Sequence, residues 1–319
     1  MCFSAKVQQD VRKLAREFHA KVAEEAFLDL FERRSAGEAI KVSRALEMAF
    51  REPANATERQ IKEVNDAFSA NQAREWETEI FKQRQRLTAA EESMKNRETK
   101  AARETVRIAT KKIDTLLARL SDLKKSDYRD SDGRIFPIVY APVIVEKDGQ
   151  RLVWPMRYTC RLAGKPAEYD GKYPGTYNAR RDSLGGFWKP VYGRNHAVMV
   201  ISSFFENVPK HLFEHRSLAA DEKASNLVLQ FTPDTGRDML VACLWDRWQG
   251  KDGSDLYSFA AITDDPPVEV AATGHQRCVI ALRESNLDEW LTPKNVDCHR
   301  LDSILSEKDM FYYQNSIAA

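Results

Sequence analysis

The sequence lacks any apolar run that approaches the roughly 20 residues needed to cross a bilayer. Its first residues also lack the basic and apolar regions of a secretory signal peptide. These two absences predict a protein that has no membrane partner and is cytoplasmic.

Cysteines are few, and their positions exclude two common uses. The 5 cysteines are odd in number and widely scattered, which is typical of reduced thiols and not of a disulfide framework. No CxxC pair and no HExxH motif is present, and the adjacent Cys298 and His299 are a poor start for a metal site. The sequence therefore predicts no metal and no cofactor.

Net charge is almost absent as well. The 49 Lys and Arg residues and the 48 Asp and Glu residues give a formal net charge of +1. Because a nearly neutral chain does not coat a polyanion by charge alone, any contact with nucleic acid has to come from a local basic patch. The 30% of charged residues and the mean hydropathy of −0.54 are typical of a globular protein with a large solvated helical surface.

The amino-acid pattern changes near residue 128, from one typical of helices to one typical of strands. Before it, apolar side chains at spacings of three and four residues predict long helices at Val7–Phe18 and Val106–Leu123. Thr57–Gln60 is typical of a capping box at a helix start, and Lys124–Asp127 of a helix end. The stretch between these marks is dense in charges of both signs, which favours a solvated helix face over a nucleic-acid-binding arm.

The apolar stripe of Val106–Leu123 is narrow, like the seam of a coiled coil. We expect it to pack against Val7–Phe18 in the same chain, and the same stripe of a second chain is the alternative. Either arrangement gives a helical hairpin or a small bundle, because a structureless segment of this length would be improbable.

After residue 128 the pattern becomes that of strands. Two β-rich runs surround Asp148-Gly149, which predicts a hairpin, and further short strands are expected at 197–205, 239–248 and 256–263. Their separations vary, and the helical spacing of α/β folds is absent. We therefore expect an α+β protein with a mixed, largely antiparallel sheet curled on itself.

Position 2 holds a cysteine, which becomes the first residue when Met1 is removed. An N-terminal cysteine carries an α-amine with a reference pKa of about 7.7–8.0 and a thiol with one of about 8.5, so both nucleophiles are partly available near neutral pH. Taken alone, Cys2 is better explained as a small residue that is tolerated after the initiator methionine than as a catalytic nucleophile.

Three segments in the second half place polar side chains where strands or loops end. YPGTYNARRDSL contains Asn178 and Arg180, VMVISSFFENV delivers Glu206 at the end of an apolar run, and ATGHQRCVIAL sets His275 before another. Singly, each has an ordinary explanation as a turn residue, a surface charge or a loop histidine.

Together with Cys2, these segments resemble the SRAP family (SOS-response-associated peptidase), whose members shield abasic sites in DNA. That family begins Met-Cys and carries an Asn-Ala-Arg motif, a glutamate at a strand end and a His-Asp-Arg-Met-Pro context. Here the matching stretches, in the same order, are Met1-Cys2, Asn178-Ala179-Arg180, Phe204-Phe205-Glu206-Asn207 and His275-Gln276-Arg277-Cys278-Val279. The usual Met-Cys-Gly-Arg start is altered at Phe3-Ser4, so a basic side chain beside the nucleophile is missing.

The resemblance implies a division of the chain into three parts. Residues 1–9 would be the N-terminal catalytic segment of the core, 10–127 a helical insertion, and 128–319 the remainder of the SRAP-like core. The insertion would bind another protein, self-associate or modulate access to the site.

The resemblance also implies a reaction with DNA. An abasic deoxyribose is in equilibrium with an open-chain aldehyde, which an aminothiol traps as an imine and then as a five-membered thiazolidine. Cys2 would be the nucleophile, Glu206 a general acid and base, His275 a donor to the departing sugar oxygen, and Asn178 a hydrogen-bond partner of the α-amine. The chain would thus be an enzyme with crosslinking or lyase-like activity on single-stranded DNA.

DNA binding requires phosphate contacts and a surface on which a base can stack. By the motif match, Arg180 is the first candidate for a phosphate contact. Trp154 or Trp188 would stack on a base. A purely structural role in the hydrophobic core explains either tryptophan equally well. Further phosphate candidates are Arg181, Arg157, Arg161, Lys189 and Arg194.

Two other classes of function stay open at this point. One is a cysteine peptidase or amidohydrolase with Cys2 as its N-terminal nucleophile, which would also explain self-removal of Met1. The other is a non-enzymatic scaffold that acts through the helical insertion.

Overall fold

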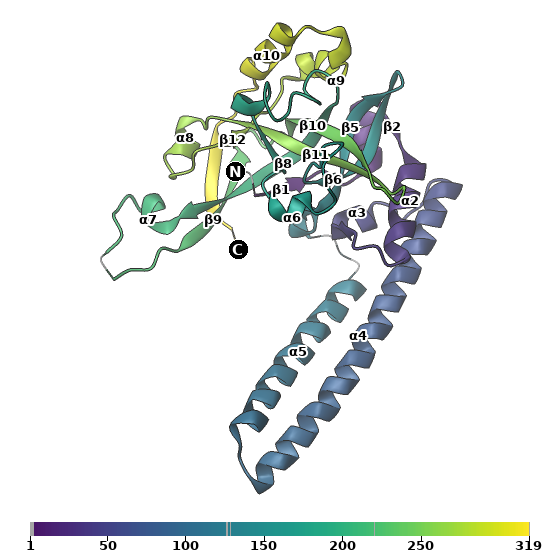
Figure 1. Cartoon of the computed structure of the whole chain (residues 1–319), viewed down its shortest axis with the longest axis vertical. Coiled ribbons are helices and arrows are strands. Elements are labelled where there is room, and N and C mark those ends of the chain that lie inside the picture. The colour runs from purple at the N-terminus through teal and green to yellow at the C-terminus, as the bar shows by residue number, and fades with distance from the viewer. Residues whose placement is uncertain (1–2, 126, 128, 220, 319) are drawn as a thin grey trace. The chain divides into compact units, whose positions relative to one another are not determined.

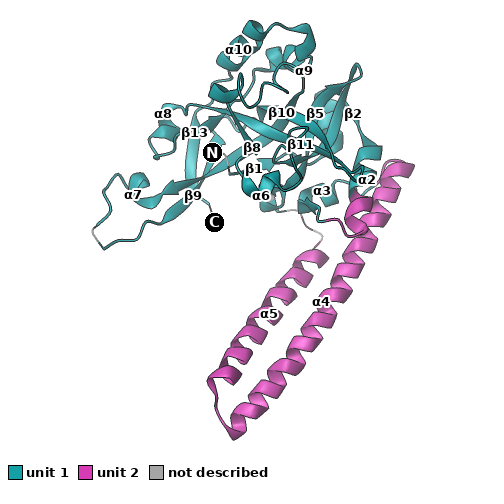
Figure 2. Ribbon diagram, in the orientation of Figure 1, with its two compact units in different colours: residues 1–30, 39–52, 129–319 teal, residues 31–38, 53–128 magenta. Residues whose placement is uncertain are grey.

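The computed structural model describes residues 3–125, 127, 129–219 and 221–318 (Figure 1). The chain divides into two compact units, one of residues 1–30, 39–52 and 129–319 and one of residues 31–38 and 53–128 (Figure 2). The segment 10–127, which the family resemblance implies to be a helical insertion, contributes residues to both units. Among the described residues, no helix is both long and apolar enough to span a membrane.

The strands, in chain order, have the following bounds: β1 (Ser4–Val7), β2 (Lys21–Val22), β3 (Lys41–Val42), β4 (Arg134–Ile135), β5 (Val139–Lys147), β6 (Gln150–Tyr158), β7 (Asn178–Arg180), β8 (His196–Pro209), β9 (Asn226–Pro233), β10 (Met239–Gln249), β11 (Asp255–Asp264), β12 (Cys278–Val279) and β13 (Tyr313–Ile317). The α-helices are α1 (Val11–Glu17), α2 (Glu24–Ser35), α3 (Arg44–Met48), α4 (Ala56–Asn96), α5 (Lys100–Lys124), α6 (Tyr169–Lys172), α7 (Lys210–Phe213), α8 (Val268–Ala271), α9 (Leu287–Leu291) and α10 (Cys298–Ser306). Short 3₁₀ turns are η1 (Asp130–Gly133), η2 (Arg181–Ser183), η3 (Glu284–Asn286) and η4 (Pro293–Asn295).

All these strands belong to one sheet, whose main order is β13-β9-β8-β10-β11-β6-β5-β3. Strands β8 and β5 also pair with each other, so β8, β10, β11, β6 and β5 close into a ring. Most pairings are antiparallel, and those of β6 and β7 with β11, of β2 with β6 and of β3 with β5 are parallel. The predicted mixed, largely antiparallel, curled sheet of an α+β protein is confirmed.

The hairpin of β5 and β6 forms where Asp148-Gly149 predicts it. Both residues have positive φ, 54° and 75°, as a two-residue turn of type I′ requires, and the Glu146 carboxylate accepts a hydrogen bond from the Gly149 N–H at 2.8 Å. The turn sets the register Lys147 opposite Gln150, and the apolar side chains of the two strands then alternate into the core.

The barrel interior is filled by aromatic and aliphatic side chains from the strands. Phe204, Phe231 and Phe259 are fully buried, and the rings of Phe204 and Phe231 stack at 5.1 Å between centroids. Full burial of each such side chain contributes about 1.5–3 kcal/mol. This core fixes the strand ends at which the polar side chains lie.

The helix predicted at Val7–Phe18 is shorter than expected, because Val7 belongs to a strand. Residues Ser4–Val7 pair with β8, and the helix starts only at Val11, because Asp10 caps it by accepting hydrogen bonds from the N–H groups of Arg12 and Lys13. Residues before and after α2 also join the β-core, since β2 adds to β6 and β3 adds to β5. The N-terminal third of the chain is therefore shared between the two units.

The second unit is a hairpin of the long helices α4 and α5. The α5 stripe, represented by Ile113, Leu116 and Leu120, packs against Ile80 and neighbouring residues of α4. The helical hairpin is thus confirmed, but the predicted partner, Val7–Phe18, is wrong. That segment does not supply the matching seam because its helix, α1, belongs to the first unit, where it contacts β2 and β6 and buries Val11 and Leu14.

The cap of α4 lies two residues before the expected one. Asn55 accepts a hydrogen bond from the Glu58 N–H, and the Glu58 carboxylate accepts one from the Ala54 N–H. Thr57 lies inside the first turn, so the predicted box at Thr57–Gln60 is wrong. The predicted end of α5 at Lys124 is confirmed.

Candidate functional site

A buried carboxyl group next to an imidazole forms the centre of the candidate site. Glu206, near the end of β8, is completely buried, and its Oε2 lies 3.2 Å from Nε2 of His275. Burial raises the pKa of Glu206 above its ordinary value, and the hydrogen bond with His275 opposes part of that rise. The structure therefore brings together two of the side chains that the sequence singled out.

Two short strands bring the other matched segments to one end of β11. Strand β7 places Asn178 opposite Ala261 and Arg180 opposite Thr263, while β12 places Val279 opposite the same Thr263 from the other side. Asn178 is buried. Segments that are about a hundred residues apart in sequence thus flank a single strand end, as expected of site residues carried on a sheet.

A shared carboxylate joins these two segments. Asp182 lies 2.7 Å from the guanidinium of Arg180 and 3.7 Å from that of Arg277. Arg180 and Asp182 are well exposed, whereas Arg277 is mostly buried. Two arginines therefore converge on one carboxylate, and Arg277 is two residues from His275 in the chain. Sequence reasoning did not choose Arg277 as a phosphate contact, although the residue stood inside the compared motif.

The loop that carries His275 depends on a glycine. Gly274 has a φ of +88°, in the region that favours glycine, and a Cβ atom added there would lie 2.7 Å from Cβ of Leu212. No larger residue fits without moving α7 or the loop. Gly274 thus sets the position from which the imidazole reaches Glu206.

The position of Cys2 lies outside the described residues, but the strand that follows it is described. Strand β1 pairs with β8 so that Ser4 lies opposite Phe205, and the Phe3 N–H donates to the Phe205 carbonyl at 3.3 Å. The start of the described chain is therefore held beside the residue that precedes Glu206.

The buried cysteines are poor nucleophiles. Burial raises the pKa of Cys278 to about 12, with the nearby Glu206 adding to the rise, and burial likewise raises the pKa values of Cys160 and Cys243. Cys298 is exposed at the start of α10.

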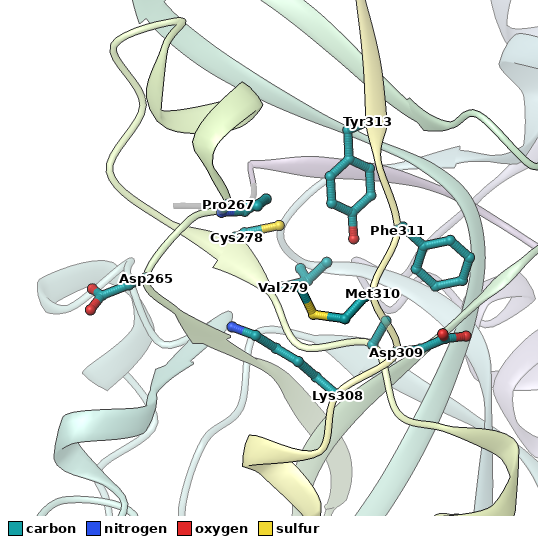
Figure 3. A pocket seen from close by; sticks show the side chains of 10 residues that line it. Asp265, Pro267, Cys278, Val279, Lys308, Asp309, Met310, Phe311 and Tyr313 are labelled. Atoms are coloured by element: carbon teal, nitrogen blue, oxygen red, sulfur yellow. The ribbon is translucent and has the colours of Figure 1, made fainter.

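The segment that follows His275 lines a small cavity. Cys278 and Val279 of β12 line it together with Tyr313 and Lys308 (Figure 3). Its volume of about 30 Å³ is close to that of one water molecule. The cavity is too small to hold a sugar or a base.

Three further arginines proposed for DNA are engaged within the protein. Arg157 and Arg161 both bind the carboxylate of Asp170, at 2.6 Å and 3.1 Å, and are largely buried. Arg181 binds Asp264 at 3.1 Å and also α10. These contacts leave fewer donors for phosphate than Arg180 has.

The two tryptophans proposed for stacking differ in exposure. Trp188 is buried, which fits its alternative place in the core. Trp154 is partly buried, with its ring 5.2 Å from that of Tyr257 and the Lys147 ammonium 4.4 Å above it. Within the described ranges, no group of three or more His, Cys, Asp or Glu side chains is placed to hold a metal ion.

Comparison with known proteins matches residues 84–316 to the family described as "SOS response associated peptidase (SRAP)". The matched range contains Asn178, Glu206 and His275 and does not include Cys2.

Two curated relatives are abasic site processing proteins from Bacillus subtilis (strain 168). YoqW is 37% identical over 135 residues, which cover 41% of this chain and 54% of YoqW, and YobE is 30% identical over 145 residues, which cover 44% of this chain and 60% of YobE. The chain thus spans between half and two thirds of the length of these relatives. A crystal structure of a protein from Bacteroides thetaiotaomicron is similar at 18% identity and a TM-score of 0.46, covering 58% of this chain and 77% of that one.

Proposed function

This chain belongs to the SRAP family, and we propose that it recognises abasic sites in single-stranded DNA and shields them through a covalent bond to Cys2. The names of the curated relatives, abasic site processing proteins, support the substrate. The single observation that carries the proposal is the contact of the buried Glu206 with His275 beside the strand that follows Cys2.

The proposed reaction joins two atoms of Cys2 to one carbon of the sugar. After removal of Met1, the α-amine attacks C1′ of the open-chain aldehyde and water leaves, which gives an imine. The Cys2 sulfur then adds to the same carbon, and its proton passes to the imine nitrogen. The product is a thiazolidine, and the net loss is one water molecule.

Glu206 has the properties needed to move these protons. A carboxyl group whose pKa is raised by burial keeps its proton nearer to neutral pH, so it donates to the departing oxygen and later accepts a proton as a base. His275, 3.2 Å away, is placed to exchange a proton with Glu206 or to donate to the sugar oxygen. We assign Asn178 to the α-amine because β7 holds its buried side chain at the same end of β11 as the histidine segment.

Arg180 and Arg277 are the phosphate contacts that the geometry favours. They already share a carboxylate, Asp182, and a phosphate oxygen is the same kind of acceptor. Arg180→Ala is expected to weaken binding to abasic DNA and to reduce the slope of log affinity against log salt by about 0.7 for a single strand. An unchanged salt slope would contradict the assignment.

A second activity, self-removal of Met1 by the same nucleophile, is favoured by the family's description as a peptidase. We assign no catalytic group to the helical hairpin, and we propose that it binds another protein, self-associates or modulates access.

The decisive test compares two cysteine variants. The purified wild-type chain is mixed with a single-stranded oligonucleotide that contains one abasic site, and its intact mass is measured. We expect loss of Met1 and a species heavier by the DNA minus one water. Cys2→Ala should form no stable adduct, while Cys298→Ala, which removes an exposed cysteine, should react like the wild type. Equal adduct formation by Cys2→Ala would refute the thiazolidine.

A further inference from the structure

Two phenylalanines lie exposed beside the strand that follows the N-terminal cysteine. Phe3 and Phe136 are 36% and 40% exposed, and their ring centroids are 5.6 Å apart with an interplanar angle of 74°. Single exposed apolar residues are common in proteins, but two aromatic rings in edge-to-face contact at the surface form an apolar face that is available to a partner.

A guanidinium group borders this face. The Cζ atom of Arg134 lies 3.6 Å from the ring centroid of the buried Phe205 and 4.9 Å from that of Phe136, and its Nε donates to the Ser4 hydroxyl at 3.0 Å. In the part of the chain that the structure describes, its terminal nitrogens donate to no acceptor. Arg134 therefore has a fixed position and retains N–H donors for an external anion.

The backbone that presents Phe136 is strained. Ile138, two residues later, is β-branched and has a φ of 71°, a conformation that such residues rarely adopt. Its N–H donates to the Thr159 hydroxyl at 3.2 Å, and the Val139 N–H donates to the Phe136 carbonyl at 3.1 Å. Strain of this kind persists where the surrounding structure fixes it, and it is concentrated at ligand-binding positions.

The aromatic face also lies next to the candidate site. Phe3 follows Cys2 directly in the chain, and its N–H donates to the carbonyl of Phe205, the residue before Glu206. A nucleotide joined to a sugar that is bound at Cys2 would therefore meet these rings within one nucleotide step.

We propose that Phe3, Phe136 and Arg134 form a platform on which the nucleobase next to the abasic residue stacks, while Arg134 binds a phosphate beside it. This inference rests on the proposed function. A base combines a flat apolar face with a neighbouring anion, which matches two exposed rings bordered by a cation. Stacking of this kind tolerates any base, because every base has a π-face.

The test uses a tetrahydrofuran abasic analogue, which has no aldehyde and so reports binding without crosslinking. A fluorescent 2-aminopurine is placed directly 5′ or directly 3′ of the analogue in a single strand. Wild type should quench the probe on at least one side. Phe136→Ala should abolish that quenching and weaken binding by roughly fivefold or more. Phe136→Leu, which keeps an apolar side chain, should behave like Phe136→Ala if the ring face is what matters.

Phe81→Ala is the matched control, since Phe81 is a 62% exposed phenylalanine on α4. It should quench and bind like the wild type. If Phe136→Ala also quenches and binds like the wild type, the platform is refuted. Replacing the flanking base by a second abasic analogue should remove the difference between wild type and Phe136→Ala, and a persistent difference would show that the ring does not contact the base.

The proposed function is checked on the same preparations with a natural abasic strand. A wild type that crosslinks while Phe136→Ala binds normally would refute the platform alone. A wild type that neither crosslinks nor prefers abasic DNA would refute the proposed function, and the platform with it.

Discussion

Replacing Gly274 by alanine should disturb both the stability of the protein and the position of His275. The φ of +88° is unfavourable for alanine, which costs on the order of 1–3 kcal/mol. In addition, the new Cβ atom would lie 2.7 Å from Cβ of Leu212, an atom that cannot move without the α7 backbone, and relieving such an overlap costs about 1–3 kcal/mol. Together these effects predict a loss of about 2 kcal/mol or more in the free energy of unfolding.

For a unit of this size, such a loss lowers the melting temperature by roughly 4–8 °C. Circular dichroism melts of wild type and Gly274→Ala measure the change in melting temperature. A crosslinking time course measures the reaction rate, which should fall if His275 is displaced. The expected result is a lower melting temperature together with slower crosslinking.

Gly236→Ala is the matched control. Its φ is +66°, but an added Cβ would meet nothing within 4 Å, so it should lose only the backbone contribution. The double variant Gly274→Ala/Leu212→Gly lacks the Leu212 Cβ atom that the new methyl group would overlap. Its loss in free energy of unfolding should be smaller than the sum of the losses of the two single variants. If Gly274→Ala melts like Gly236→Ala, the steric argument is wrong.

Two further predictions concern the buried carboxyl group and the helical hairpin. Because the raised pKa of Glu206 means that the folded chain holds a proton that the unfolded chain loses, its contribution to stability falls as pH rises through the window above the ordinary glutamate value. Urea melts at about pH 5 and about pH 8 should therefore show that Glu206→Gln gains stability relative to wild type at the higher pH, and an equal gap at both values would contradict the raised pKa. In the hairpin, Leu116→Ala should cost about 2–5 kcal/mol, since Leu116 is buried between α4 and α5. Leu117→Ala, at a 42% exposed position, should cost within about 0.5 kcal/mol, and equal losses of helical signal on heating would show that the seam is misassigned.

Local pattern was sufficient for several features of the fold. Asp148-Gly149 specified its hairpin because a two-residue turn needs two residues that tolerate positive φ, and the end of α5 at Lys124 followed from the chain's own end signals. The α+β class and the helical hairpin followed from periodicity. These features depend on residues close together in sequence.

Only the tertiary structure shows which helix packs against the apolar stripe of α5. The stripe of α5 is equally compatible with any apolar helix. It packs against α4, while α1, the helix of the predicted partner segment, contacts β2 and β6 in the other unit. A spacing of apolar residues specifies which face is buried but carries no information about what covers it.

The same distinction holds for the candidate site. The sequence by itself determined which residue types were available, and its motifs singled out Asn178, Glu206 and His275. Only the tertiary structure decided that Glu206 is fully buried 3.2 Å from His275, that Arg180 and Arg277 share Asp182, and that Arg157 and Arg161 are engaged by Asp170. The physical reason is that burial and ion pairing depend on long-range strand pairing, which brings distant segments to one strand end.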